Sequence, residues 1–418
     1  MRVRVPYFCF LLLLIWTSMQ AKESSNLLHD YIKLALESNT EILSAQLAAE
    51  ASQQDSRLNS ALPDPAFMVE GRGIPLQASL FSETREWMFM LEQMFPPPGT
   101  LKRLQEKGQF SADIETEMLQ AVRNDIRQQV KKLYYDISYL DAALATNREH
   151  VLLLDEFEQI AQRKYVVGKS GQQDLYQIKI EQARLKTEEL SLQEKRSSKA
   201  AELNRLLKRD LYETIPAAQL DSTITQLSNV IFDSLLIKSN PFLKAARIRI
   251  AAGENDIDLA LANKRPSLKV MGGYMAMNDR DDALMGRVGL TLPFMPWSSK
   301  DTRAALEKSR VLRNKYETDY ITLKDQLAVR IAETTNSISA LADQINLYNT
   351  KIVPASEHTV TLSIAAYQTD SLDFLSLVQY AREQLKNELR RDELISSYQQ
   401  KLAQLEYILG TSLDEVIK

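Results

Sequence analysis

The sequence is poor in the residues that tie or bend a chain. It has a single cysteine, Cys9, among 418 residues, which excludes an internal disulfide framework and a cysteine-rich metal site. Glycine (12) and proline (13) are both scarce, so turns are few and the helices and strands between them are predicted to be long. The net charge of −4 excludes the strongly basic surface that nucleic acids require, and we expect no nucleic-acid partner.

Long apolar runs are missing after the first residues. Residues 1–21 combine a basic start, an apolar run at Tyr7–Trp16 and small residues up to Ala21, which predicts a signal peptide that is removed. An uncleaved anchor helix is the alternative, but the apolar run is short for crossing a bilayer. Because Cys9 lies in this segment, the mature chain would have no cysteine. Any part of it inside a membrane would have to be built from strands.

Most of the remaining chain has apolar residues at helical spacing. The stretch from Leu101 to about Lys164 has no proline and one glycine, Gly108, and a helix of this length would reach about 100 Å. Tyr165–Gly171 interrupts the pattern, and helical spacing resumes from Gln172 to Leu207. This arrangement predicts a long helical hairpin with a short turn at its end.

Two stretches, Leu62–Gly99 and Pro266–Trp297, differ from the rest. Each has two short runs rich in aromatic and branched residues between prolines and glycines, which is typical of a β-hairpin. Most of these runs alternate between apolar residues and polar or small ones, as strands between lipid and water do. Trp87–Leu91 is apolar on both faces, so the sequence does not decide its phase, that is, which of its residues face lipid. An ordinary soluble sheet is the alternative; four strands in a membrane would leave open edges and require an oligomer.

The two hairpins belong to an internal duplication with an offset of about 200 residues. Three pairs of residues keep nearly this offset: Asn39 and Asn240, Pro65 and Pro266, and Gly71 and Gly272. We therefore predict a leader at 1–21, a first repeat at 22–229 and a second repeat of the same layout at 230–418. Each repeat would run helix, strand, strand, long helix, turn and helix. The predicted fold class is mainly α with a small β part.

This pattern resembles the outer-membrane efflux protein (TolC) family over the whole mature chain. The motifs that carry the resemblance are Ala35–Asn39 and Ser239–Pro241, Pro65 and Pro266, Gln93–Pro96 and Leu292–Phe294, Tyr165–Gly168 with Asp174 and Leu175, and Leu207 and Gly410 at helix ends. Arg72–Pro75 and Phe95–Gly99 favour the heavy-metal efflux branch. The resemblance implies long coiled-coil helical hairpins and four strands per chain in a trimeric, twelve-stranded outer-membrane barrel.

The resemblance also implies a function and partners. The chain would be the outer-membrane channel of a tripartite efflux system, exporting small solutes, with metal ions among the candidates, passively from the periplasm to the outside. It would form a homotrimer in outer-membrane lipid with its helical part in the periplasm. Its partners would be a periplasmic adaptor (membrane fusion) protein and an inner-membrane pump of the RND type. A non-conducting periplasmic coiled-coil scaffold is the alternative.

The turns at the ends of the helical hairpins are the candidate sites. By resemblance, the periplasmic gate comprises Tyr367, Asp373 and Ser376, with the serine standing where the family has a second aspartate. We expect the Tyr367 turn to be about three residues shorter than the Tyr165 turn and to lack its glycine. The predicted adaptor-docking tip comprises Tyr165, Val166, Val167, Gly168 and Asp174. The alternative for Asp174 and Asp373 is a helix N-cap role alone.

No motif indicates an enzyme, a cofactor or a resident metal. Three histidines, His29, His150 and His358, share no ligand spacing, and we expect solvated helix positions for them. Val167–Ser170 is similar to a phosphate loop, but Arg163 occupies the position of its first glycine. We find no paired carboxylate, nucleophile elbow or zinc helix, so we expect no catalytic residue.

Methionine is unevenly distributed. Of the 12 methionines, all except Met1, Met19 and Met118 lie within the two hairpin regions. Thioether sulfur suits Cu(I) and Ag(I), but methionine is also a flexible apolar filler, and we expect the filler role. Replacing Met271, Met275 and Met277 by leucine is then expected to leave copper and silver resistance unchanged.

Overall fold

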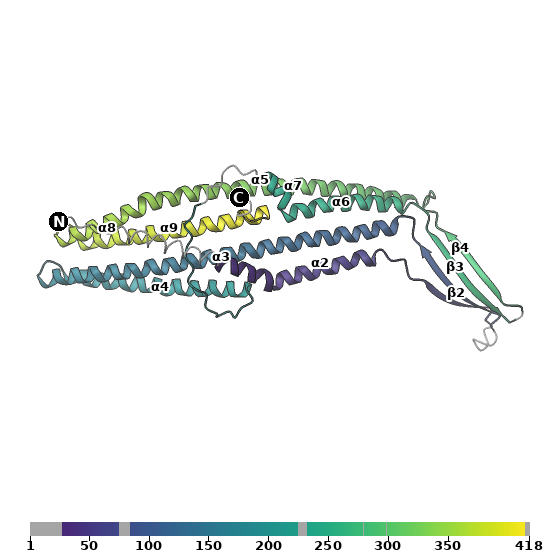
Figure 1. Ribbon diagram of the computed structural model, residues 1–418, viewed down its shortest axis with the longest axis horizontal. Coiled ribbons are helices and arrows are strands. Elements are labelled where there is room, and N and C mark those ends of the chain that lie inside the picture. Colours follow the sequence, from purple (N-terminus) through teal and green to yellow (C-terminus); the bar gives the residue numbers. More distant parts are fainter. Residues whose placement is uncertain (1–26, 75–83, 225–231, 279, 298, 414–418) are drawn as a thin grey trace, which may run out of the picture. The chain divides into compact units, whose positions relative to one another are not determined.

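The computed structural model describes residues 27–74, 84–224, 232–278, 280–297 and 299–413. The predicted leader, 1–21, lies outside the described residues. Of the described residues, 73% are helical, and the same residues include four strands (Figure 1). The predicted class, mainly α with a small β part, is confirmed. No helix among the described residues combines the length and apolar character needed to cross a membrane.

The chain forms two compact units, each built from several segments. The helical unit comprises residues 1–43, 121–240 and 327–418, and the strand unit comprises residues 44–120 and 241–326. Both units therefore contain parts of both predicted repeats.

The strand unit contains a four-stranded antiparallel sheet in the order β1-β2-β3-β4. Its strands are β1 (Ala66–Arg72), β2 (Glu86–Phe95), β3 (Leu268–Met277) and β4 (Ala283–Leu290). Strands β1 and β2 come from the first predicted hairpin, and β3 and β4 come from the second. The central pair, β2 and β3, joins the two halves of the chain, with Phe89 opposite Tyr274. Strands β1 and β4 form the two edges.

The two faces of this sheet differ in chemistry. Residues that pair across antiparallel strands share a face. Trp87, Phe89 and Leu91 therefore share a face with Phe67 and Val69 of β1, which settles the phase that the sequence left undecided. The opposite face carries charged residues and methionines.

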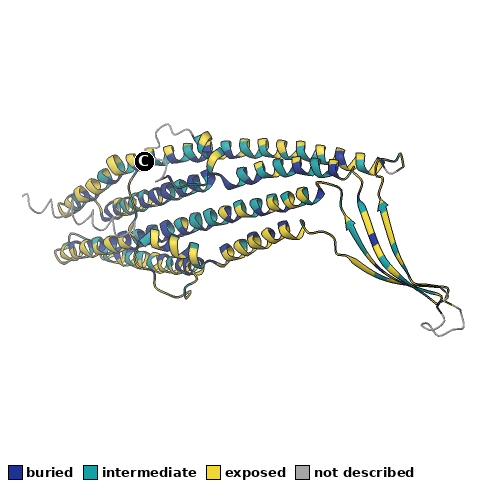
Figure 2. Ribbon diagram, turned by 45° about the vertical axis from the view of Figure 1, so that its right-hand side comes forward, coloured by how far each residue is buried: buried dark blue, intermediate teal, exposed yellow. Residues whose placement is uncertain are grey.

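The apolar face is largely exposed in the single chain (Figure 2). Phe67 of β1 is 67% exposed, and Leu284 and Val288 of β4 are 88% and 69% exposed. The predicted alternation of an apolar and a polar face is therefore present.

The helices of the strand unit are α2 (Thr40–Leu58), the first part of α3 (Thr100–Val166), α6 (Pro241–Ala262) and the first part of α7 (Ser299–Leu347). The single glycine of the long helix has a packing reason. A Cβ atom at Gly108 would lie 2.5 Å from the Cα atom of Ser56, so only glycine allows α2 and α3 to approach this closely. Asn255 of α6 donates to the carbonyl oxygen of Arg103 at 2.8 Å and so joins α6 to α3.

The helical unit contains the rest of α3 and α7 with α4 (Gln172–Leu206), α5 (Phe232–Ser239), a short π-helix η1 (Tyr348–Ile352), α8 (Val353–Gln368) and α9 (Phe374–Leu409). The predicted long helix is α3, with 67 residues. Its counterpart is interrupted at η1, because Pro354 is the second residue of α8, which begins directly after η1. Proline has no N–H to donate back to the preceding turn, which widens there.

Two asparagines make corresponding contacts in the helical unit. Asn39 donates to the carbonyl oxygen of Leu206 at 3.2 Å, near the end of α4. Asn240 donates to the carbonyl oxygen of Ile408 at 2.7 Å, near the end of α9. Asn39 also accepts from the N–H of Glu41 at 2.8 Å, as expected for the N-cap of α2.

Candidate functional site

The candidate site lies at two turns of the helical unit. One turn, 167–171, joins α3 to α4, and the other, 369–373, joins α8 to α9. Gly168 and Asp370 both have positive φ, 72° and 62°. Each turn has the two backbone hydrogen bonds of a Schellman motif. In the first turn, Gly168 donates to Tyr165 and Lys169 donates to Lys164. In the second turn, Asp370 donates to Tyr367 and Ser371 donates to Ala366. The two turns therefore share one backbone conformation.

This equivalence corrects one expectation. The turns have the same length, so the prediction that the second is about three residues shorter is wrong. Asp373 corresponds to Gly171, since these two residues are the N-caps of α9 and α4. Asp174 corresponds to Ser376. The second turn does lack a glycine, and Asp370 takes the left-handed conformation in its place.

Asp373 is the N-cap of α9, which is the role that the sequence analysis gave as the alternative to the gate. Its carboxylate accepts from the N–H of Ser376 at 3.0 Å and from the Ser376 hydroxyl at 2.7 Å. These hydrogen bonds lower the pKa of Asp373. Asp174 is not an N-cap, because Gly171 occupies that position in α4 without a side-chain cap.

Asp174 instead binds the tyrosine of the other turn. Its carboxylate accepts from Ser170 at 2.6 Å and from the Tyr367 hydroxyl at 3.2 Å. The Tyr367 side chain is only 3% exposed, and its ring lies 5.5 Å from that of Phe374. Burial raises the pKa of Tyr367. The structure thus brings one predicted gate residue, Tyr367, together with one predicted docking residue, Asp174.

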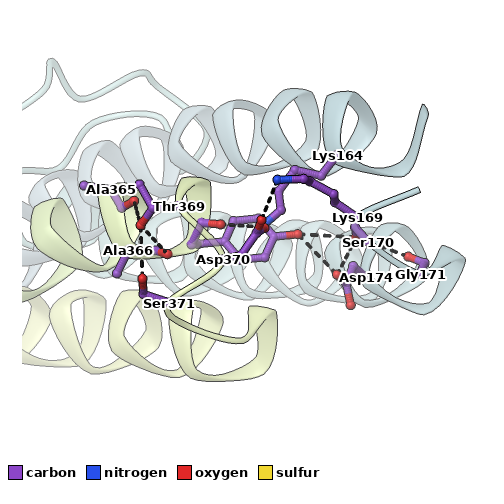
Figure 3. A network of polar contacts seen from close by, with 11 residues as sticks. Lys164, Lys169, Ser170, Gly171, Asp174, Ala365, Ala366, Thr369, Asp370 and Ser371 are labelled. Carbon is purple, nitrogen blue, oxygen red and sulfur yellow. Dashed lines mark hydrogen bonds and ion pairs between the residues drawn. The ribbon is translucent and has the colours of Figure 1, made fainter. Parts of the chain in front are cut away.

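Three charged residues that the sequence analysis did not select connect the two turns (Figure 3). Lys164 at the end of α3 and Lys169 of the first turn lie 2.7 and 2.8 Å from the carboxylate of Asp370. The Lys164 ammonium lies 4.0 Å from the centre of the Tyr367 ring and donates to the Tyr367 carbonyl oxygen. Hydrogen bonds from both ammonium groups lower the pKa of Asp370 to about 2. We call these residues, with Ser170, Asp174 and Tyr367, the tip network.

A sequence signal for this network existed but was indirect. Asp370 stands where the equivalent turn has Gly168, and aspartate is one of the few residues that tolerate the left-handed conformation. The sequence analysis matched Tyr165 with Tyr367, and continuing that alignment without a gap matches Gly168 with Asp370.

The other predicted docking residues face outward. Tyr165, Val166 and Val167 are 43%, 74% and 67% exposed, and a Cβ atom at Gly168 would have no neighbour within 4 Å. The first turn therefore presents an apolar surface, which we call the apolar tip. The equivalent tyrosine of the second turn is buried, so the two turns present different chemistry.

An ion pair and a histidine–glutamate contact join the helical hairpin of α3 and α4 to α9. Arg382 donates to the buried Glu181 of α4, through Nε at 2.8 Å, and His150 of α3 lies 3.0 Å from Glu388. His150 is only 5% exposed, so the expectation of a solvated position is wrong for this histidine. His29 and His358 are exposed, as expected. Within the described ranges, no group of three or more His, Cys, Asp or Glu residues could hold a metal ion.

Comparison with known proteins identifies the type of chain. The model of the outer membrane efflux protein family matches residues 234–411. This part of the chain is similar to that family. The matched range lies within the predicted second repeat, and the resemblance inferred from the sequence is confirmed. No curated protein matches the chain.

Solved structures match nearly the whole chain. Those of CusC match with a TM-score of 0.81 and 18% identity, covering 93% of this chain and 92% of that chain. VceC from Vibrio cholerae, an outer membrane protein, matches at 0.77 and 17%, covering 92% and 96%. The open state of the outer membrane channel MtrE from Neisseria gonorrhoeae matches at 0.77 and 18%, covering 93% and 89%. At these identities the likeness shows the fold, and the expected outer-membrane location agrees with the family's description.

Proposed function

We propose that this chain is the outer-membrane channel of a tripartite efflux system and that it exports small solutes passively. The observation that carries the proposal is the sheet with two unlike faces. Its apolar face is exposed in the single chain, as at Phe67, Leu284 and Val288. Such a face suits contact with lipid acyl chains, and the charged opposite face suits a water-filled lumen.

The sheet also supports a homotrimer. Strands β1 and β4 form its edges, and lipid does not tolerate the unpaired N–H and C=O groups of an open edge. Pairing the β4 edge of one chain with the β1 edge of the next satisfies these groups, and three chains of four strands close a twelve-stranded barrel. The interface would then be part of the channel wall.

The proposed chain layout is two structural repeats, 22–229 and 230–418, after a leader at 1–21. The corresponding contacts of Asn39 and Asn240 and the shared conformation of the two turns support it. In this layout each repeat contributes two strands to the barrel and one hairpin to a helical tunnel in the periplasm.

The two turns are proposed to do different work. The apolar tip suits docking of a periplasmic adaptor protein, because exposed valines without charge favour contact with another apolar surface. The gate assignment covers Tyr367, Asp373 and Ser376. The buried Tyr367, linked to Asp174, supports the gate most directly, whereas Asp373 and Ser376 form a helix cap that sets the start of α9.

The remaining partners follow from the proposed system. A channel that exports passively needs an energised partner, which we propose to be an inner-membrane pump of the RND type connected through the adaptor. We propose no catalytic role for the chain. A non-conducting periplasmic scaffold is the competing function.

Fractionation, crosslinking and conductance test the proposal together. We expect the protein in the outer-membrane fraction, as a crosslinked trimer that gives single-channel currents in planar bilayers. A periplasmic protein without conductance would favour the scaffold. A membrane protein that crosslinks only as monomers or dimers would contradict the trimer.

A further inference from the structure

The sheet of the strand unit gathers six methionines into one contact cluster. Met88, Met90 and Met271 are buried, with exposed fractions of 0%, 5% and 8%. Three partly buried methionines pack against them: Met68, Met275 and Met285. All four strands contribute to this group, which we call the methionine cluster. The other described methionines, which lie outside the cluster, are Met94, Met118, Met277 and Met295.

The strand register explains how the six side chains meet. Met68 lies opposite Met90, and Met88 lies opposite Met275. Side chains that are paired across strands are in contact distance, with Cβ atoms about 5 Å apart. Met90 also lies opposite Gly273, whose other neighbour is Met285. The cluster therefore crosses the sheet from β1 to β4.

Gly273 gives the cluster its continuity. A Cβ atom at this position would lie 3.0 Å from Cγ of Met90 and 2.6 Å from the carbonyl oxygen of Phe89. Any larger residue would force the β2 backbone at Phe89, together with the Met90 side chain, away from β3. Glycine thus leaves room for Met90 between Met68 and Met285.

The position of the cluster distinguishes it from ordinary core filling. The six methionines lie on the face that carries Glu92, Lys269 and Arg287, opposite the exposed apolar face. The cluster lies between charged residues on the water side of the proposed barrel. The buried methionines fill space as apolar side chains do, and their place on this face also puts their soft sulfur atoms beside the proposed lumen.

The charged neighbours also favour sulfur over oxygen as the ligand. The carboxylate of Glu92 lies 3.2 Å from the ammonium of Lys269, and Glu70 lies 2.8 Å from the guanidinium of Arg72. Because these carboxylates are paired with cations, they attract a hard divalent cation less strongly. The thioethers are neutral, soft donors.

We propose that the methionine cluster binds a soft monovalent cation, Cu(I) or Ag(I). The proposal names a cargo for the efflux function above and rests on that function for its physiological meaning. It differs from the filler role expected from the sequence, because the sequence alone did not place the six residues on one face. Thioethers do not titrate, so binding is expected to be independent of pH between about 5 and 8, unlike binding at histidine or cysteine.

The first test measures silver binding by the purified full chain, with silver nitrate as the probe. The Cys9→Ser variant is used as the reference, because it leaves thioethers as the only sulfur atoms. We expect binding by calorimetry, and sulfur neighbours around silver by X-ray absorption. The triple variant Met88→Leu, Met90→Leu, Met271→Leu should bind at least tenfold more weakly.

A matched triple variant controls for the number of methionines and for folding. Met94→Leu, Met118→Leu and Met295→Leu change three residues outside the cluster and should leave silver binding unchanged. Leucine has nearly the volume of methionine, and such exchanges are well tolerated. Circular dichroism and trimer crosslinking identify any variant that fails to fold. Gly273→Ala keeps all six thioethers but displaces Met90, and it should also weaken binding.

Three results would overturn the proposal: no silver binding by the reference protein, a shell of only nitrogen and oxygen around silver, or equal losses in the two triple variants. Planar-bilayer recordings separate this proposal from the efflux function. A channel that conducts without binding silver overturns the metal site alone. A protein that binds silver through sulfur but does not conduct overturns the efflux function alone.

Discussion

The two turns of the helical unit share a backbone and differ in what they present. Gly168 and Asp370 take the same left-handed conformation, and each follows a tyrosine by three residues. Tyr165 is 43% exposed, whereas Tyr367 is 3% exposed. One turn therefore ends in an apolar surface, and the other is held in place by ion pairs and a buried aromatic ring.

This difference shows how two turns with one backbone conformation can present different surfaces. The hydrogen bonds of the Schellman motif set the backbone in both turns. The side chains of the two turns can therefore differ without changing the backbone. A few substitutions are enough to give one turn an exposed surface for a partner and the other an internal contact. Each prediction below breaks or sharpens this contrast, from the largest expected effect to the smallest.

The largest effect is expected from Tyr367→Ala compared with Tyr165→Ala. Removing a buried aromatic ring costs about 3–5 kcal/mol, so amide hydrogen exchange in the second turn should accelerate at least a hundredfold. Tyr165→Ala removes a largely exposed ring and should change exchange little. Equal acceleration in both variants would contradict the contrast between the two tyrosines.

Exchanging the turn residues should separate docking from gating. Gly168→Asp places a charge in the apolar tip and should weaken adaptor binding at least tenfold in a pull-down or by surface plasmon resonance, since burying an uncompensated charge is costly. The conductance of the isolated trimer should not change. Asp370→Gly is the reverse exchange, and it should leave adaptor binding intact. Loss of adaptor binding in both variants would argue against a division of work.

Asp370→Asn should release the tip network while keeping a residue that tolerates positive φ. We expect a several-fold higher conductance of the isolated trimer in planar bilayers, because Lys164 and Lys169 lose their shared partner. The pH dependence follows from the pKa of about 2 for Asp370. A lowered pKa means that the ion pairs stabilise the fold above the ordinary pKa near 3.8 and are lost as the pH falls through about 2.

The pH profile provides the control for this prediction. In the unmodified channel, conductance should not change through Asp370 between about pH 5 and 8 and should increase as the pH falls through about 2, where Asp370 is protonated. In Asp370→Asn this acid-induced increase should be absent. An identical rise in both proteins would assign the acid response to other groups.

The smallest effect is expected at the helix cap of the second turn. Asp373→Ala removes the acceptor for Ser376, so the first turn of α9 should fray and hydrogen exchange there should rise severalfold. We predict a modest change in conductance or cation preference with the adaptor still bound. Ser376→Ala keeps the backbone N–H donor and should have a smaller effect. If exchange rises without any change in current, Asp373 is a cap and not part of the gate.

The helices and strands were predictable because their signals are local. Gly108 is the only glycine in a long helical pattern, and α3 extends through it as a single helix. Alternation along Phe67–Val69 was enough to predict a strand. The register between β2 and β3 was not predictable, because it depends on contacts between distant segments. That register decided the phase of Trp87–Leu91 and assembled the methionine cluster.

The candidate site was predictable only in part, for a physical reason. Tyr367 and Asp174 were selected from motifs, but their mutual hydrogen bond is a contact between two hairpins. Lys164 and Asp370 are ordinary surface residues in the sequence, and only the shared conformation of the two turns brings their charges together. The exposed valines were recognised because a lack of polar side chains is visible without a partner.

The pairing of β2 with β3 has a consequence for how the chain matures. Their partners are separated by about 180 residues, so the central pair has a high contact order and a large loop-closure cost. Until β3 is available, β2 has an open edge and an uncovered apolar face at Phe89 and Leu91. Such a species pairs readily with the wrong strand. The slow, aggregation-prone stage of maturation should therefore be closure of this central pair, after the helices have formed.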